Sequence, residues 1–186
     1  MRELILKMSM SLDGFVSDLE GRNAWMFGAD QEAKAWSVEM LWSAGVHIMG
    51  SRTFAAMAGH WPTATDQFAP PMNEIPKLVF SRQGPAILPS GTGSWAAAQV
   101  AGGDLAEEIA ALKAQDGKPI GAHGGVSFAR SLIAAGLVDR FVLLVAPVAL
   151  GRGKALFSDL ETPLPLALVE SRAFPGGAVA QTYRPA

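Results

Sequence analysis

The chain of 186 residues contains no cysteine. This absence excludes disulfide bonds, thiolate metal ligands and thiol nucleophiles, and it is typical of a protein of the reducing cytoplasm, where we expect this one to reside. Charge is also scarce, since 17% of the residues are charged and the formal net charge is -2. So small an excess of charge indicates neither a nucleic-acid surface nor a disordered acidic tail, and we expect no nucleic-acid partner.

Long apolar runs are missing as well. No stretch approaches the roughly 20 apolar residues of a membrane span, and residues 1–7 are interrupted by Glu3 and Lys7 and lack the core of a signal peptide. We therefore expect an unexported protein without a membrane partner. Histidine is rare too, and Asp159 and Glu161 do not pair with any histidine at metal-ligand spacing, so no metal site is predicted.

Apolar residues, in contrast, make up 49% of the chain. A chain of this length can bury a core of its own, and no repeat, low-complexity tract or linker divides it. Residues 1–186 are therefore predicted to form a single domain.

Short apolar segments alternate with amphipathic ones along most of this domain. Strands are predicted over 4–10, 46–49, 77–81, 93–97, 118–122 and 138–148, and helices over 30–43, 54–58, from 104 onward and over 127–135. Two late strands, 164–171 and 178–184, have no helix between them and form an antiparallel pair. The alternation predicts an α/β fold of three layers, with a mostly parallel central sheet, helices on both faces and an antiparallel C-terminal edge.

Local signals set several of the expected boundaries. Asp30 is a candidate N-cap, Asp104 with Glu107 resembles a capping box, and Gly59 is expected to end the helix over 54–58. Residues 61–76 are rich in proline, threonine and aspartate and are predicted to form an exposed connection.

Two of the predicted strands pass into their helices through glycine. The sequence over 121–128 places Gly124 and Gly125 at one such junction, and Gly50 precedes Ser51, Arg52 and Thr53 at another. Glycine lets a ligand approach the backbone, and the free N–H groups of a helix N-terminus attract anions. A purely structural glycine turn is the alternative for either junction alone.

Arginine strengthens the interpretation of these junctions as a phosphate site. Arg52 follows Gly50, and Arg82 follows the strand over 77–81. Either arginine alone would be interpreted as a surface charge. Two guanidinium groups at successive strand ends, together with two glycine junctions, favour recognition of a phosphate.

Several segments, taken in order along the chain, resemble the dihydrofolate reductase-like superfamily. The branch they resemble most is the C-terminal reductase domain of the bifunctional riboflavin-biosynthesis deaminase-reductase, with its stand-alone relatives. The resemblance extends over nearly the whole chain and rests on residues 8–16, 47–54, 77–82, 123–125, 136–139 and 146–157.

This resemblance implies a dihydrofolate reductase-like fold and an NADPH-dependent oxidoreductase. The implied substrate is a pyrimidine- or pteridine-like heterocycle, as for 5-amino-6-(5-phosphoribosylamino)uracil reductase or dihydrofolate reductase. By resemblance, Arg52 contacts the 2′-phosphate with Arg82 as its helper. The matched cofactor positions are Gly50, Ser51, Arg52 and Thr53 at the adenosine-side phosphates, Ser81 beside the adenosine, Gly124, Gly125, Val126 and Ser127 at the pyrophosphate, and Ser9 and Val16 flanking the nicotinamide.

Asp13 is the candidate catalytic residue, because it lies in the Ser-Leu-Asp-Gly signature that the riboflavin branch carries on the substrate side. The alternative is that Asp13 only forms a turn before Gly14, as aspartate commonly does. The proton source stays open among Asp13, Glu32, His60 and a bound water. His47 is interpreted as a core histidine and His123 as a space-filling residue beside the pyrophosphate.

The chain also departs from its relatives. Dihydrofolate reductases carry an acidic residue on the first helix, whereas the matching region here has Lys34 near that place and Glu32 two residues away, so dihydrofolate is not the expected substrate. The zinc deaminase half is not expected because its cysteine ligands are missing. Two alternatives remain open: reduction of an unrelated carbonyl or imine, and NADPH binding without turnover. The late strands and the apolar strand over 141–148 also suggest a homodimer, as the resemblance implies.

Overall fold

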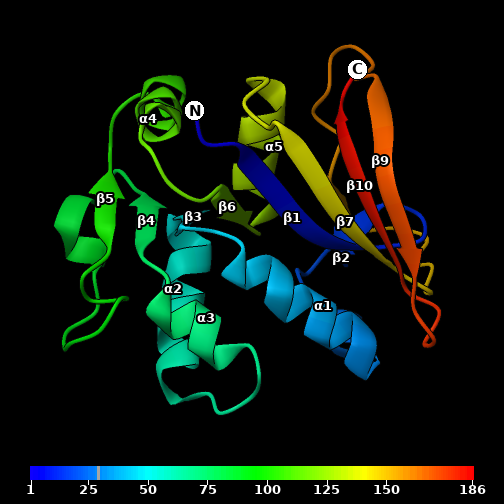
Figure 1. The fold of residues 1–186 in the computed structure, drawn as a ribbon, viewed down its shortest axis with the longest axis horizontal. Helices are drawn as coiled ribbons and strands as arrows, with labels where there is room; N and C mark the ends of the chain where they lie inside the picture. Colours follow the sequence, from blue (N-terminus) through cyan, green and yellow to red (C-terminus); the bar gives the residue numbers. More distant parts are fainter. Residues whose placement is uncertain (29) are drawn as a thin grey trace.

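A computed structural model describes residues 1–28 and 30–186 of the chain. Its centre is an eight-stranded sheet in the order β5-β4-β3-β6-β1-β7-β10-β9 (Figure 1). The strands of this sheet are β1 (Leu4–Ser11), β3 (Val46–Gly50), β4 (Lys77–Phe80), β5 (Gln99–Ala101), β6 (Ile120–His123), β7 (Arg140–Ala146), β9 (Leu166–Ala173) and β10 (Val179–Pro185). Two short strands, β2 (Phe15–Ser17) and β8 (Lys154–Ala155), pair with each other outside it.

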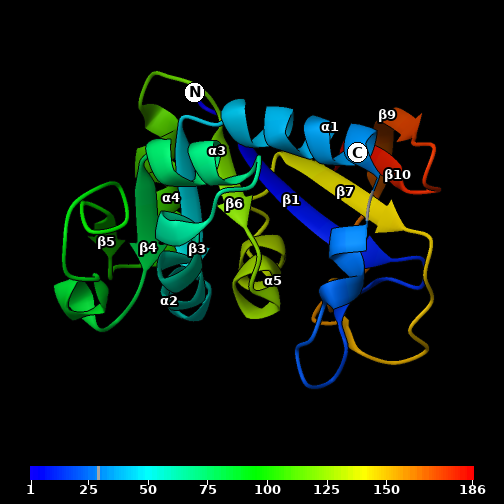
Figure 2. The ribbon, with the colours of Figure 1, turned by 90° about the horizontal axis from the view of Figure 1, so that it is seen from below.

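Helices cover both faces of the sheet, which gives the expected three layers. Helices α4 (Leu105–Ala114) and α5 (Val126–Ala134) lie on one face, and α1 (Gln31–Trp42), α2 (Ser51–His60) and α3 (Ala69–Glu74) lie on the other side (Figures 1 and 2). Three short 3-10 helices, Ala24–Gly28, Trp61–Thr63 and Gly84–Ile87, lie in the connections.

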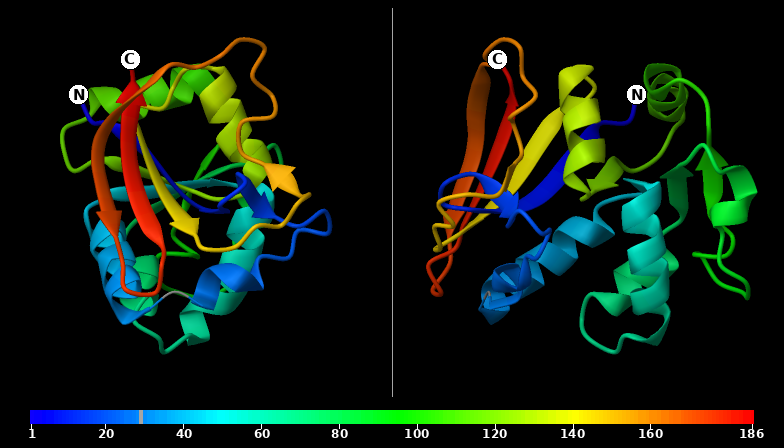
Figure 3. Two further views of the ribbon diagram at one scale, coloured as in Figure 1. Left: turned by 90° about the vertical axis from the view of Figure 1, so that its right-hand side faces the viewer. Right: turned by 180° about the vertical axis from the view of Figure 1, so that it is seen from behind.

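The register of the sheet confirms a mostly parallel sheet with an antiparallel edge. Strands β5, β4, β3, β6, β1 and β7 run parallel, and β10 pairs antiparallel with both β7 and β9. The two late strands therefore form the antiparallel pair that the sequence predicts, at the outer edge seen in Figure 3.

The core is divided by the sheet because successive strand residues point to opposite faces. On β1, Leu4, Leu6 and Met8 are buried in the cluster under α4 and α5, whereas Ile5 packs under α1 with Trp36. The helix caps match the sequence signals: the Asp30 carboxylate accepts from the Ala33 backbone N–H, and Asp104 accepts from Ala106 and Glu107.

Two expectations about the middle of the chain are wrong. Helix α2 does not stop at Gly59 but continues to His60, because Gly59 keeps a helical backbone and Pro62 is the residue that ends regular helix. Residues 61–76 are not simply an exposed connection, because the first turn of α3 contains two prolines of this segment. Met72 of this helix is buried beside Phe54.

The strand expected over 93–97 is also wrong. This segment forms a turn, and the neighbouring strand β5 lies at Gln99–Ala101. Trp95 lies in this turn, and its side chain is buried against Phe54. Its indole N–H donates to Asn73 Oδ1 at 2.9 Å. An apolar side chain thus fills the core without a strand to carry it. In the described part of the chain, no helix is both long enough and apolar enough to cross a bilayer.

Candidate functional site

The site candidates from three strands meet at one edge of the sheet. Strand β3 pairs in parallel with β4 on one side and with β6 on the other, so their carboxyl ends are neighbours. Arg52, Arg82 and Gly124 follow these three ends. Carboxyl ends of parallel strands are where α/β sheets bind ligands.

One hydrogen bond joins the two glycine junctions. Thr53 Oγ1, in the first turn of α2, donates to the carbonyl oxygen of Gly124 at 3.2 Å. The next residue, Gly125, has φ +84°, and a Cβ there would overlap Thr53 Oγ1. Glycine is therefore required at this position both for its backbone conformation and for space.

Aromatic packing holds the same two junctions in place. The Phe128 ring, on the first turns of α5, lies 5.1 Å from the ring of Phe80 at the end of β4. A Cβ on Gly50 would lie 3.2 Å from Phe128 Cβ, so α5 packs closely against the end of β3. The junctions after β3, β4 and β6 thus form one packed unit.

Both helices at this unit begin without a side-chain cap. The N-cap residues are Gly50 for α2 and Gly125 for α5, and neither can satisfy the first backbone N–H groups with a side chain. Val126 and Ser127 form the first turn of α5, with Ser127 exposed. Free N–H groups at two neighbouring helix N-termini provide a partial positive charge that suits phosphate groups.

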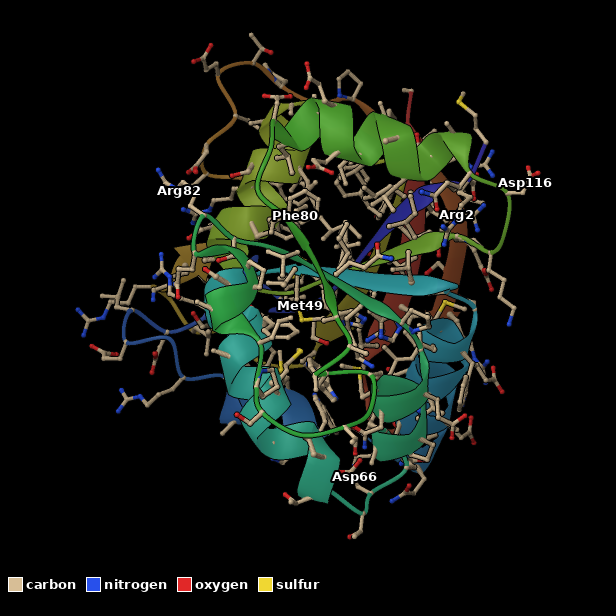
Figure 4. The ribbon with its side chains drawn as sticks, turned by 90° about the vertical axis from the view of Figure 1, so that its left-hand side faces the viewer. Arg2, Met49, Asp66, Phe80, Arg82 and Asp116 are labelled. Carbon is tan, nitrogen blue, oxygen red and sulfur yellow. The ribbon has the colours of Figure 1, made fainter. Side chains whose placement is uncertain are left out.

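The two arginines add full positive charges. Arg52 and Arg82 are exposed, and neither lies within ion-pair distance of a carboxylate in residues 1–28 and 30–186. Figure 4 labels Arg82 at the periphery of the molecule, beyond Phe80 at the end of β4. Guanidinium groups without a carboxylate partner remain available for a phosphate.

A hollow of about 390 Å³ opens beside Arg82. Its size lies in the range of small-molecule sites. Ser81 is buried at its base, and its hydroxyl accepts from the Gln83 backbone N–H at 3.1 Å. The lining residues are Ser81, Arg82, Gly84, Pro85, Leu88, Ala98, Val100 and Gly102. Apolar walls beside a guanidinium fit a flat base that carries a phosphorylated sugar, so the residues present fit NADPH at this end.

The two positions matched to the nicotinamide differ in their surroundings. Ser9 is half-buried on β1, opposite Leu144 of β7. Val16, on β2, is buried in the core cluster that also holds Met8. Since Ser9 and Met8 point to opposite faces of β1, only Ser9 lies on the α1 face. The structure does not bring the two matched side chains onto one face.

Asp13 connects two loops at this edge. Its carboxylate accepts from Ser11 Oγ at 2.6 Å and from the backbone N–H groups of Leu150 and Gly151, the latter at 2.7 Å. These hydrogen bonds lower the pKa of Asp13 to about 2, the Ser11 hydroxyl contributing most. This environment favours the turn-forming interpretation. The catalytic assignment of Asp13 stays a prediction.

The first helix offers no inward carboxylate at the places compared. Glu32 is exposed, and its nearest cation is Arg172 at 3.9 Å, on β9. Lys34 is half-buried. The departure expected from the sequence is thus also a departure in space, since Glu32 points toward the antiparallel edge of the sheet.

Sequence reasoning missed a polar group under the centre of the sheet. Lys7 on β1 is paired in register with His123 on β6, and the His47 ring on β3 lies 4.3 Å from the His123 ring, edge to face. Lys7 Nζ lies 5.9 Å from the Trp36 ring of α1. Lys7, His47 and His123 line a cavity of about 20 Å³, enough for a water molecule.

Burial lowers the pKa of every member of this group. Desolvation lowers the pKa of Lys7 to about 8 and that of His47 to about 4. It also lowers the pKa of His123 well below its usual value, and His47, Lys7 and Lys77 add to the effect. His47 Nε2 lies 3.3 Å from the Leu41 carbonyl oxygen, whereas His47 Nδ1 and His123 Nε2 are buried without a partner in the described chain.

The signal for Lys7 was present in the sequence. A lysine inside an apolar strand needs a reason to be there, and its alternation with Ser9 puts both residues on one face. From the sequence alone, Lys7 was interpreted only as an interruption of the apolar run. Which strand lies beside β1, and hence the approach of His123, could not be inferred from the spacing along the chain.

No three histidine, cysteine, aspartate or glutamate side chains gather as possible metal ligands within residues 1–28 and 30–186. The expectation of no metal site stays an expectation.

The chain is similar in sequence to known proteins. The profile of the RibD C-terminal domain family matches residues 2–180. The uncharacterized protein YyaP of Bacillus subtilis (strain 168) is 30% identical over 182 residues, which is 98% of this chain and 94% of that protein.

Two solved structures are similar in fold. A pyrimidine reductase-like protein from Corynebacterium diphtheriae superposes with a TM-score of 0.70 at 18% identity, covering 100% of this chain and 92% of the other. Dihydrofolate reductase from Enterococcus faecalis, complexed with NADP(H), superposes with a TM-score of 0.62 at 15% identity, covering 98% and 96%. The fold is therefore dihydrofolate reductase-like, as the sequence resemblance implies.

Proposed function

The chain belongs to the RibD C-terminal domain family, and from this premise we propose that it is an NADPH-dependent reductase of a pyrimidine- or pteridine-like heterocycle. One observation carries the proposal: two uncapped helix N-termini are joined by the Thr53–Gly124 hydrogen bond, beside two arginines with no carboxylate partner in the described chain. This arrangement suits a ligand with several phosphates. The family and the fold supply the reductase half of the inference.

Separate groups of residues along the carboxyl edge of the sheet would hold the separate parts of NADPH. Arg52 would bind the 2′-phosphate with help from Arg82, while the hollow beside Ser81 would take the adenosine. Gly124 to Ser127 would face the pyrophosphate with backbone N–H groups. Ser9 would lie at the nicotinamide end, whereas Val16, matched to the same end by resemblance, is buried in the core. Bound NADPH supplies the hydride, and the protein orients it and excludes water.

The proton that follows the hydride needs a donor with a suitable pKa. Asp13, with its pKa near 2, is ionised at neutral pH and cannot donate. Lys7, with its pKa lowered to about 8, is mostly protonated at neutral pH yet releases its proton readily. It lies on the same face of β1 as Ser9, two residues away. We propose Lys7 as a further candidate for the proton source, beside Glu32, His60 and a bound water.

We keep a second candidate function, because Glu32 of α1 is exposed and position 34 carries a lysine, so neither position offers an inward carboxylate. A protein that binds NADPH without turnover would keep the phosphate site and need no donor. Reduction of an unrelated carbonyl or imine would keep the same cofactor site and differ only in the substrate.

Calorimetric titration with NADPH tests the cofactor half. Arg52→Ala should weaken binding by roughly 10- to 150-fold, because losing a charge-assisted contact costs about 1.5 to 3 kcal/mol. Arg184→Ala is the control, since this arginine lies beside Glu3 at the opposite end of the sheet. Absence of binding at millimolar NADPH would refute the proposal.

The substrate half is tested separately by following NADPH oxidation. We expect turnover with members of a panel of pyrimidines and pteridines and none with simple ketones or imines. Turnover only with the ketones or imines would move the substrate to the second class. Tight NADPH binding with no oxidation by any compound would favour the non-catalytic alternative.

A further inference from the structure

Asn73, in the last turn of α3, is hydrogen-bonded to two separate segments through its side chain. Its Nδ2 donates to the carbonyl oxygen of Trp61 at 2.8 Å, and its Oδ1 accepts from the indole N–H of Trp95 at 2.9 Å. These partners lie 12 positions before and 22 positions after Asn73 in the chain. One side-chain amide therefore joins the segment before α3 to a segment that follows β4.

The chemistry of the two partners explains why position 73 carries asparagine. An indole N–H can only donate a hydrogen bond, and a carbonyl oxygen can only accept one. A side chain between them must offer one acceptor and one donor, as a carboxamide does. Aspartate has the same shape but would place an oxygen against the Trp61 carbonyl oxygen. The two partners therefore fix both the residue type and the orientation of the amide.

The first partner belongs to the carboxyl end of α2. Trp61 is the C-cap residue of this helix, and α3 lies beside α2 (Figures 1 and 2). The opposite end of α2 carries Arg52 and Thr53 in its first turn. A helix of ten residues moves as a unit, because each turn is hydrogen-bonded to the next. The Asn73–Trp61 hydrogen bond thus helps to fix the helix that presents Arg52.

The second partner belongs to the packing behind the hollow beside Arg82. Leu88 and Ala98 both line this hollow, and the turn that carries Trp95 lies between them in the chain. Ala98 is buried in the same apolar cluster as Trp95, and Leu88 packs against that cluster. The position of the Trp95 ring therefore affects two walls of the hollow.

The backbone of Asn73 holds the same turn through a neighbouring residue. Ser94 Oγ donates to the carbonyl oxygen of Asn73 and accepts from Lys77 Nζ, the latter at 2.6 Å. Lys77 Nζ also lies 4.7 Å from the centre of the Trp95 ring. Two consecutive residues of the turn, Ser94 and Trp95, are thus attached to Asn73, so the turn and α3 are held together as one unit.

We propose that Asn73 is a positioning residue of the cofactor site, which fixes the helix that carries Arg52 relative to the hollow beside Arg82. This inference rests on the proposed function, because NADPH is the ligand that would contact both places. Asn73 acts through Trp61 and Trp95. A ligand that binds two places at once binds more tightly when their separation is set before it arrives.

Two substitutions remove the two side-chain hydrogen bonds separately, and calorimetric titration with NADPH and with NADH measures their effects. Trp95→Phe keeps a ring but removes the indole N–H, so it should weaken the binding of both dinucleotides by the same factor, roughly 3- to 10-fold. Asn73→Asp keeps the acceptor for Trp95 and loses the donor to Trp61. It should weaken NADPH binding by a similar factor and NADH binding much less, because NADH lacks the 2′-phosphate that Arg52 would hold.

Glu74→Gln is the matched control, since it changes the charge by one at the exposed neighbouring residue and should leave NADPH binding unchanged. It separates the lost hydrogen bond from the charge that Asn73→Asp adds. Circular dichroism checks folding, and Trp95→Phe decides the question alone if Asn73→Asp does not fold.

The outcomes distinguish this inference from the function on which it rests. A wild type that does not bind NADPH would overturn the proposed function, and the positioning role with it. Wild-type binding with unchanged NADPH affinity in the folded variants would overturn the positioning role alone, even if both variants were less stable. Equal losses of NADPH and NADH affinity in Asn73→Asp would also overturn it.

Discussion

At the scale of single residues, two lysines with similarly lowered pKa values have different roles. Burial lowers the pKa of both Lys7 and Lys77 to about 8. Lys77 donates to the Ile75 carbonyl oxygen and to Ser94 Oγ, both at 2.6 Å, and it lies over the Trp95 ring. It is part of the packing. Lys7 lies close to Trp36 and His123 and has no hydrogen-bond partner in the described chain.

Replacing Lys7 should therefore raise stability while lowering turnover. The pKa of Lys7 in the folded state lies below its unfolded value of 10.5, so its charge opposes folding below pH 8. Lys7→Met should stabilise the protein by about 1 to 3 kcal/mol at pH 7. It should also reduce NADPH oxidation by roughly 100-fold, the usual contribution of a proton donor.

Urea denaturation and steady-state kinetics measure the two effects of Lys7→Met. Lys77→Met is the matched control, and it should destabilise the fold because it leaves Ser94 and the Ile75 carbonyl oxygen without their donor. If Lys7→Met left the turnover number unchanged, Lys7 would not be the proton donor.

At the scale of elements, the sequence predicted best where a pattern was long and capped. The helices that begin after Asp30 and Asp104 start where their caps predict, because a capping carboxylate acts on the backbone within a few residues. Predictions failed between β3 and β5. There, α3 and the turn that carries Trp95 are stabilised by packing on Phe54, a contact that short-range patterns do not contain.

A single side chain, that of Asp13, holds the loops after β1 and β7 together at the carboxyl edge of the sheet. Asp13→Ala would free the N–H groups of Leu150 and Gly151 and loosen the loop after β7. We expect faster hydrogen exchange over 148–152 and several-fold weaker NADPH binding, with little loss of global stability. Because the pKa of Asp13 is lowered to about 2, this connection should persist until the pH falls through the region between 4 and 2.

Hydrogen exchange followed by mass spectrometry checks this expectation. Asp18→Ala is the control, since Asp18 pairs with the exposed Arg22 in the same region of the chain. Unchanged exchange over 148–152 in Asp13→Ala would show that the loop is held by other contacts and would contradict the turn-forming interpretation of Asp13.

At the scale of the whole molecule, the central sheet buries two neutral histidines between its strands and α1. His47 and His123 face each other, and the charges nearest to them are Lys7 and Lys77. No carboxylate lines the cavity that His47 and His123 share with Lys7. Protonation of either imidazole would place a positive charge beside others of the same sign.

Stability should therefore fall on mild acidification. The unfolded histidines take up protons below pH 6.5 while the folded ones do not, so the free energy of unfolding should decrease between about pH 6.5 and 4. Each buried histidine contributes a slope of about 1.4 kcal/mol per pH unit. His47→Leu should reduce this slope. Urea denaturation at a series of pH values would contradict the account if the wild-type and His47→Leu slopes were equal.

The sequence alone determined the order of elements outside the segment between β3 and β5, the mostly parallel sheet with its antiparallel edge, and the two glycine junctions that follow β3 and β6. These features depend on backbone preferences and apolar periodicity within short segments, and both are present in the local sequence. The resemblance to known reductases added the family, and the profile match confirmed it.

Only the tertiary structure decided which of these segments meet. The Thr53–Gly124 hydrogen bond, the approach of Lys7 to His123 and the open edge at β9 all depend on the order of strands in the sheet. That order arises from contacts between residues far apart in the chain, which no local pattern records. For the same reason Asp13, an obvious candidate in the sequence, forms hydrogen bonds to a loop nearly 140 positions away, while Lys7, which no sequence motif marks, lies at the centre of the sheet.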